Sequence, residues 1–120
     1  MMCEDMKIMR DSLYYAENIV NWIMGLNPFD ACMMEGYGRN NIQYSFQGRF
    51  DFLAAPGGIV NGITSDEKDE EGICFCMHPG QDNEIRDNWR WAEQWIPHTA
   101  WFLLMMGGIQ LVRKQIQAHA

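Results

Sequence analysis

The chain has 120 residues, of which 16 are acidic and 9 basic, giving a formal net charge of −7. The length suits one domain, and the acidic balance argues against nucleic acid as a partner, because phosphate backbones are bound by basic patches. The longest apolar run, Ala100 to Met106, has seven residues, far fewer than the about 18 that indicate a membrane span. We therefore expect neither nucleic acid nor a membrane as a partner.

The first ten residues do not resemble a secretory signal, because charged residues interrupt the apolar core that such a signal needs. A secreted parent would carry its signal upstream, so the compartment is left open. A long helix is then predicted from Glu4 to Met24, because its apolar residues recur at the three- and four-residue spacing of one helix face. These are Met6, Met9, Leu13, Ala16, Val20 and Ile23.

A second apolar stripe covers another side of this helix, which indicates packing on two neighbours. It consists of Ile8, Tyr15, Ile19 and Trp22. Gly25 and Pro28 are expected to end the helix.

The region from Asn27 to about Arg86 contains most of the glycines and has no long periodic run. It is predicted as a loop region with one short helix at Phe29 to Glu35 and two short strand-like pieces at Gly58 to Ile63 and Ile73 to Met77. Loops of this length inside a compact domain are normally either functional or unfolded.

Two clusters in this region invite a metal-site interpretation, and neither has the required spacing. The acidic run from Asp66 to Glu71 has His78 where a helix-loop-helix calcium site needs its last glutamate, so a solvated acidic loop is favoured. Cys74, Cys76 and His78 lack the usual two-residue gap of a zinc site. We predict no metal and no cofactor, and we interpret the four cysteines as free thiols.

A second long helix is predicted to start near Pro97, since proline suits the first turn. Gly107 and Gly108 lower helix propensity by roughly 1 kcal/mol each, so we expect a kink or a close helix contact there. The buried face is expected to comprise Trp101, Leu104, Met105, Ile109, Val112 and Ile116.

Just ahead of this helix, the segment from Asp87 to Leu103 sets one acid, Glu93, among four tryptophans. Indole rings that exclude water favour the protonated form of a carboxyl group, which suits a proton donor. Glu93 is therefore the leading catalytic candidate. The alternative is that its carboxylate satisfies free amides at the helix start.

Two stretches, in the right order, resemble glycoside hydrolase family 9, the cellulase-like inverting glycosidases. Trp89, Glu93 and Ala100 stand where that family has an aromatic residue, the acid glutamate and a small residue. The preceding G-x-NP … G-x-G-x-N segment is matched by Gly25, Asn27, Pro28, Gly36, Gly38 and Asn40. The departures are Glu84 for aspartate, Trp95 for a small residue, Thr99 for asparagine and, at Tyr44 to Arg49, the lack of a His-x-Arg element.

The resemblance implies a mainly α fold: the C-terminal part of an (α/α)6 toroid, with two long helices connected by a long loop region with short strands. The N-terminal part of the same domain would then be missing from residues 1–120. Inversion takes an acid and a base about 6.5–9.5 Å apart. The resemblance makes Glu93 the acid and places the base, an aspartate, in the missing part, although Asp87 or Glu84 could act locally.

The implied substrate is an oligo- or polysaccharide, a β-linked glucan or related plant polysaccharide. Trp89, Trp91 and Trp95 are candidates for stacking on sugar rings or for the core, and we expect one of the three at a sugar site. Arg90 and His98 are candidates for binding hydroxyl groups, while Arg90 could instead pair with Asp87 at the surface. In the glycine-flanked turn, candidates for substrate contact or for ordinary turn chemistry are Tyr37, Arg39 and Asn40. A non-catalytic helical carbohydrate-binding or assembly module and a decayed fragment are the rival hypotheses.

Overall fold

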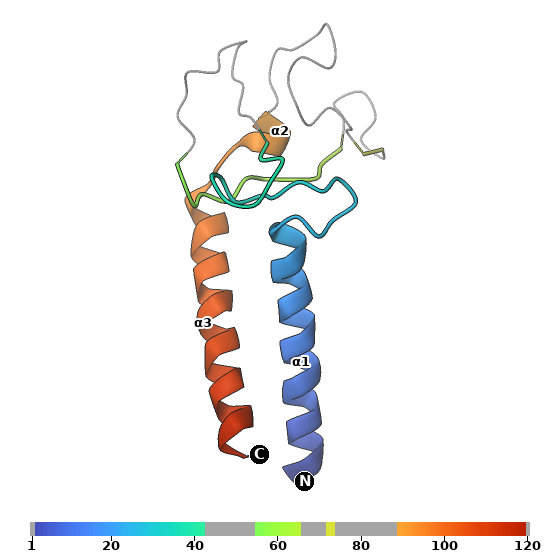
Figure 1. The fold of residues 1–120 in the computed structure, drawn as a ribbon, viewed down its shortest axis with the longest axis vertical. Coiled ribbons are helices and arrows are strands. Elements are labelled where there is room, and N and C mark those ends of the chain that lie inside the picture. The colour runs from blue at the N-terminus through green and yellow to red at the C-terminus, as the bar shows by residue number, and fades with distance from the viewer. Residues whose placement is uncertain (1, 43–54, 66–71, 74–88, 120) are drawn as a thin grey trace, which may run out of the picture.

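The computed structural model describes residues 2–42, 55–65, 72–73 and 89–119. Two long helices dominate these residues, α1 (Met2–Ile23) and α3 (Ile96–Ala118), and the short helix α2 (Trp89–Ala92) precedes α3. The long helices run antiparallel, so both termini lie at one end of the hairpin and the loops with α2 cover the other end (Figure 1). The prediction of a mainly α chain with two long helices joined by loops is confirmed at this level.

The helix α1 packs against α3 along one side. Ile109 is the one buried residue of α3 among those described, and Met105, Val112 and Ile116 beside it are half-buried. Near the open end of the hairpin, Arg113 donates to Glu17 Oε1 from Nη2 at 2.7 Å and from Nε at 3.1 Å. The facing sides of the two helices are therefore apolar, and an ion pair links the helices near the end that carries the termini.

The predicted buried face of the second helix is wrong at two positions. Trp101 is 69% exposed and Leu104 is 63% exposed. The reason is that α3 packs on a single long helix, α1, among the described residues, so only one stripe of its surface turns inward. The helix also continues unbroken through Gly107 and Gly108, where an added Cβ would meet no atom within 4 Å. The described residues therefore make no close helix contact there.

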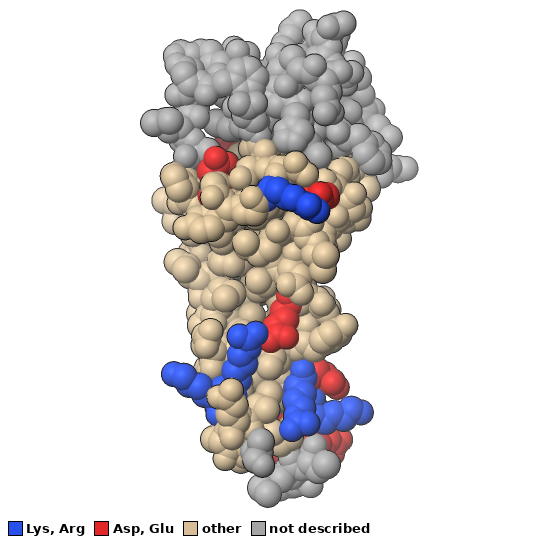
Figure 2. Space-filling view, in the orientation of Figure 1, with Lys and Arg blue, Asp and Glu red and all other residues tan. Residues whose placement is uncertain are grey.

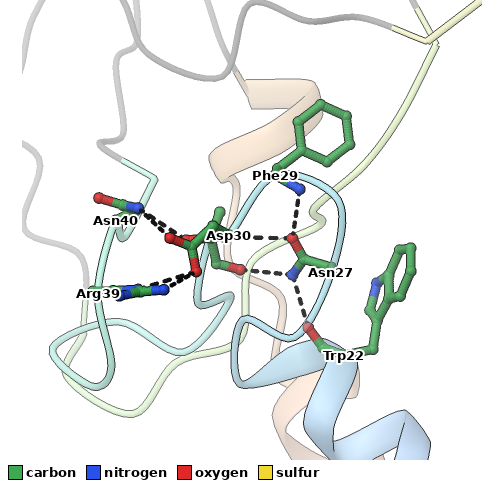
Figure 3. Close-up of polar contacts among 7 residues, drawn as sticks. Trp22, Asn27, Phe29, Asp30, Arg39 and Asn40 are labelled. Carbon is green, nitrogen blue, oxygen red and sulfur yellow. Dashed lines mark hydrogen bonds and ion pairs between the residues drawn. The ribbon is translucent and has the colours of Figure 1, made fainter.

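The short helix predicted after Pro28 does not form. The Asn27 side chain forms hydrogen bonds with backbone groups that a helix would use for its own bonds (Figure 3). Its Nδ2 donates to the carbonyls of Trp22 and Ala31, both at 2.8 Å, and its Oδ1 accepts from the Phe29 N–H at 3.1 Å. Asp30 has a positive φ of 50°, which helical backbone excludes. The segment is a compact loop.

Three segments that lie far apart in sequence meet beneath the loops. Antiparallel bridges join Met34 to Ile59 and Val60 to Gln94. The strand-like prediction for Gly58 to Ile63 is thus realised as isolated bridges, with no strand among the described residues. The second predicted piece contributes a bridge from Ile73 to Ser65, and its residues 74–77 lie outside the described part. The core here comprises Met33, Ile42, Ile59, Val60, Trp91 and Ala92.

Candidate functional site

Glu93 lies on the short link between α2 and α3, at the loop end of the hairpin. Its backbone is held by the segment that crosses it. The Asn61 N–H donates to the Glu93 carbonyl at 3.0 Å, and the Gly62 N–H donates to the Trp91 carbonyl at 2.8 Å. A third bond, from the Ile59 N–H to Thr99 Oγ1 at 3.3 Å, joins the same segment to the first turn of α3. The link is therefore fixed in place by hydrogen bonds between distant parts of the chain.

Gln94 strengthens this attachment through its side chain. Its Oε1 accepts a hydrogen bond from the Ala55 N–H at 2.9 Å. A Cβ at position 58 would lie only 2.5 Å from the same Oε1 atom, so the close approach depends on Gly58. The residues on both sides of Glu93 are thus held by the loop of residues 55–62.

The Glu93 side chain is half-buried, and its carboxylate has one hydrogen-bond donor among the described residues. That donor is the indole N–H of Trp95, whose Nε1 atom lies 2.8 Å from Oε2. The start of α3 has no side-chain cap. In the described structure, Glu93 therefore does not take the helix-capping role that was the alternative interpretation.

The tryptophans around Glu93 occupy different environments. Trp91 is 1% exposed and packs edge-on against Phe29, with ring centroids 5.1 Å apart. Its ring belongs to the core, so it offers no face for stacking on a sugar. Trp95 is 52% exposed, and the side chain of Trp89 lies outside the described residues. Among the described indoles, the contact with the Glu93 carboxylate is made by Trp95.

Arg90 and His98, the two candidates for binding hydroxyl groups, line separate cavities. Arg90 lines a cavity of about 260 Å³ with Thr64, and its Nη2 donates to Ser65 Oγ at 3.2 Å. His98 lines an apolar cavity of about 610 Å³ between the two long helices. Its Nδ1 is buried and finds no partner among the described residues. Asn61 lines both cavities, and its N–H holds the Glu93 carbonyl.

The glycine-flanked turn uses two of its predicted site residues to build the loop itself. Arg39 binds Asp30 Oδ1 through Nη2 at 2.7 Å and Nε at 3.0 Å, and the Asn40 Nδ2 donates to the Asp30 carbonyl at 3.0 Å (Figure 3). Tyr37 is 55% exposed. The described contacts of Arg39 and Asn40 are thus those of turn chemistry, and none of them reaches Glu93.

Sequence reasoning missed two residues that shape this site: Asn61 as the backbone anchor of the acid and Gln94 as the anchor of the link. It placed Trp95 among the indoles around Glu93 and did not predict its hydrogen bond to the carboxylate. The pairing of Asn61 and Gln94 with segments more than 30 residues away leaves no local pattern.

Several other predictions fall on residues that are not described. Asp87 and Glu84, the local candidates for a base, the acidic run and the Cys74 to His78 cluster all lie outside the described ranges. Within those ranges, no three metal-binding side chains gather, Cys32 is a buried free thiol, and neither long helix is apolar enough to cross a membrane.

A scan against protein-family models finds no matching family, and a search of curated proteins finds no match to this chain.

Proposed function

We propose that this chain is the C-terminal part of an inverting glycoside hydrolase similar to family 9, with Glu93 as its general acid. One observation carries the proposal. A half-buried carboxylate stands on a rigidly anchored link at the loop end of a helical hairpin, and one of its oxygens, Oε2, has a hydrogen-bond donor. The described residues leave the other oxygen available for a leaving group. The substrate class proposed is a β-linked glucan or related plant polysaccharide.

In the proposed reaction, protonated Glu93 gives its proton to the glycosidic oxygen while the bond from that oxygen to the anomeric carbon breaks. A water molecule forms the new bond to the anomeric carbon from the opposite face. Its proton passes to an aspartate base supplied by the remainder of the domain. Glu93 ends the step as a carboxylate and is reprotonated from solvent.

The exposed surface of the hairpin supports the idea that further helices complete this domain. Large apolar side chains stand exposed on both long helices, among them Ile8 and Tyr15 on α1 and Trp101 and Leu104 on α3. Between the charged groups near the termini and those near the loops, the visible face is an uncharged band (Figure 2). Large apolar side chains that gather on a protein surface normally mark an interaction site. An (α/α)6 toroid, in which each helix has two neighbours, would cover it.

The positions of the sugar-binding candidates fit the proposal to different degrees. Arg90 and His98 line two cavities that share Asn61, the residue whose N–H holds the Glu93 carbonyl. The exposed ring of Tyr37 offers a face for stacking. Arg39 and Asn40 have their polar groups engaged with Asp30, so we assign them to holding the turn.

The test compares two variants with the same chemical change, Glu93→Gln and Glu17→Gln, in the protein expressed from the full coding region that contains this chain. Reducing ends released from a soluble β-glucan are measured, and circular dichroism checks the fold. Loss of a general acid typically costs about 10²–10⁴-fold in rate, so we expect this loss for Glu93→Gln. Glu17 pairs with Arg113 far from the site, so Glu17→Gln should turn over substrate like the wild type.

Undiminished hydrolysis by Glu93→Gln would rule out the acid role. A folded wild-type protein that releases no reducing ends from any β-glucan would contradict the proposed activity itself.

A non-catalytic carbohydrate-binding module is the second candidate, favoured by the exposed aromatic rings of Tyr37 and Trp95 at the loop end. Titration of the full-length protein with cello-oligosaccharides, monitored by tryptophan fluorescence, separates the two candidates. Saturable binding by the full-length protein without hydrolysis supports the module, whereas release of inverted sugar product supports the enzyme.

A further inference from the structure

We infer that Trp95 is the positioning residue of Glu93: it determines which carboxyl oxygen carries the proton and orients that oxygen. This inference rests on the proposed function. Its basis is the hydrogen bond from Trp95 Nε1 to Glu93 Oε2, at 2.8 Å. An indole N–H can donate and cannot accept. In a neutral carboxyl group the carbonyl oxygen is a better acceptor than the hydroxyl oxygen, so the bond from the indole favours Oε2 as the carbonyl oxygen and the proton on Oε1.

Both partners of this bond are held by independent parts of the fold. Glu93 is fixed through its carbonyl by Asn61, at 3.0 Å. Trp95 has an extended backbone, with φ −118° and ψ 137°, and stands directly before α3. Its carbonyl accepts from the His98 N–H at 3.1 Å, which ties it to the first turn of that helix. The indole thus reaches back two residues from a rigid base, and rotation of the carboxyl group would break the bond.

The same bond favours the acid step energetically. When Oε1 releases its proton to the glycosidic oxygen, negative charge appears on the carboxyl group. A hydrogen bond to an ionised acceptor is stronger than one to a neutral acceptor. The Trp95 bond therefore strengthens as the proton leaves, and an interaction that grows toward the transition state raises the rate of the chemical step.

Trp95 is 52% exposed, and its indole N–H still donates to the Glu93 carboxylate. In contrast, Trp91 faces the core.

The first test uses the protein expressed from the full coding region and needs no activity. In a ¹⁵N-labelled sample, the indole N–H signal that is absent from Trp95→Phe identifies Trp95, and the signal absent from Trp101→Phe identifies Trp101. We expect this signal to move upfield as the Glu93 carboxylate is protonated, and to lose that response in Glu93→Gln. The Trp101 signal serves as the matched control. A Trp95 signal with the same pH response in wild type and Glu93→Gln would overturn the inference.

The second test measures the reaction with two leaving groups in the full-length protein. A dinitrophenolate leaves without protonation, whereas a sugar hydroxyl needs the acid. Misplacement of a catalytic group by about 1 Å can cost about 10²-fold. We expect Trp95→Phe to lower kcat on cello-oligosaccharides by about 10–100-fold, with little change in KM and near wild-type turnover of a dinitrophenyl β-cellobioside.

Equal loss on both substrates would indicate a merely structural role and would overturn the inference. The two proposals fail separately. An inactive wild-type protein contradicts the hydrolase, while the signal test still decides the Trp95 bond. If the enzyme is active and the pH response of the Trp95 signal does not depend on Glu93, the acid role of Glu93 stands and the positioning role of Trp95 is contradicted.

Discussion

At the scale of single residues, Gly38 lets the glycine-flanked turn approach Cys32 closely. Gly38 has a φ of +64°, and an added Cβ would lie 2.8 Å from the Cys32 Cβ and 2.9 Å from its Sγ. Cys32 is buried, and its N–H donates to the Arg39 carbonyl at 3.0 Å. The turn can therefore fold over Cys32 only with glycine at this position.

Gly38→Ala should destabilise the chain more than Gly57→Ala. Both residues have positive φ values, +64° and +81°, so each alanine costs about 1–2 kcal/mol in backbone strain. At position 38 the new Cβ would also crowd Cys32, and overpacking of this kind lowers the free energy of unfolding by about 1–3 kcal/mol more. At position 57 the new Cβ would meet its nearest neighbour at 4.0 Å, so no crowding is added there. Urea unfolding followed by circular dichroism measures both. Equal free energies of unfolding would contradict the close approach at Cys32.

At the scale of secondary-structure elements, α3 is held by one stripe of apolar contact and one ion pair. Ile109 is 3% exposed, whereas Leu111, two residues further along the same helix, is 59% exposed. The ion pair between Arg113 and Glu17 has side chains 48% and 35% exposed. Pairs as exposed as this contribute at most about 1 kcal/mol. The apolar stripe therefore dominates the packing of α1 on α3.

Ile109→Ala should lower the free energy of unfolding by about 2–4 kcal/mol, because it removes buried methyl groups and leaves a cavity. Leu111→Ala, its control on the exposed side of the helix, should change it by less than about 0.5 kcal/mol. Thermal or urea unfolding gives both values. A smaller effect of Ile109→Ala than of Leu111→Ala would mean that the two helices do not pack through Ile109.

At the scale of the whole molecule, large apolar side chains stand exposed on both long helices, and such surfaces favour association. The cavity of about 610 Å³ between α1 and α3 is lined at its edge by Trp22 and Trp101, which are 44% and 69% exposed. The chain alone should therefore self-associate unless other helices cover this side.

The paired substitution Trp101→Gln with Leu104→Gln should reduce that self-association. Both side chains are more than half exposed, so their replacement removes apolar surface with little loss of internal packing. Sedimentation velocity over a range of concentrations provides the measurement, and Gln110→Ala on the exposed part of α3 provides a control. A wild-type chain that stays monomeric at every concentration would show that this surface does not drive association.

The sequence by itself determined the two long helices. Their apolar periodicity, Gly25 after the first and Pro97 at the start of the second are local signals, because helical hydrogen bonds join residues four apart. The position of Glu93 just ahead of a helix follows from the same signals. The interpretation of Phe29 to Glu35 as a helix failed because the Asn27 side chain competes for its backbone groups.

Only the tertiary structure decided how the candidate site is held. The bonds of Asn61 to Glu93 and of Ala55 to Gln94 join residues more than 30 positions apart, and no periodic pattern records them. The tertiary structure also places the indoles in different environments: Trp91 is buried in the core, and Trp95 binds the Glu93 carboxylate. The physical reason is that helices are specified by neighbours in sequence, whereas the direction of a side chain on an irregular link depends on what packs against it.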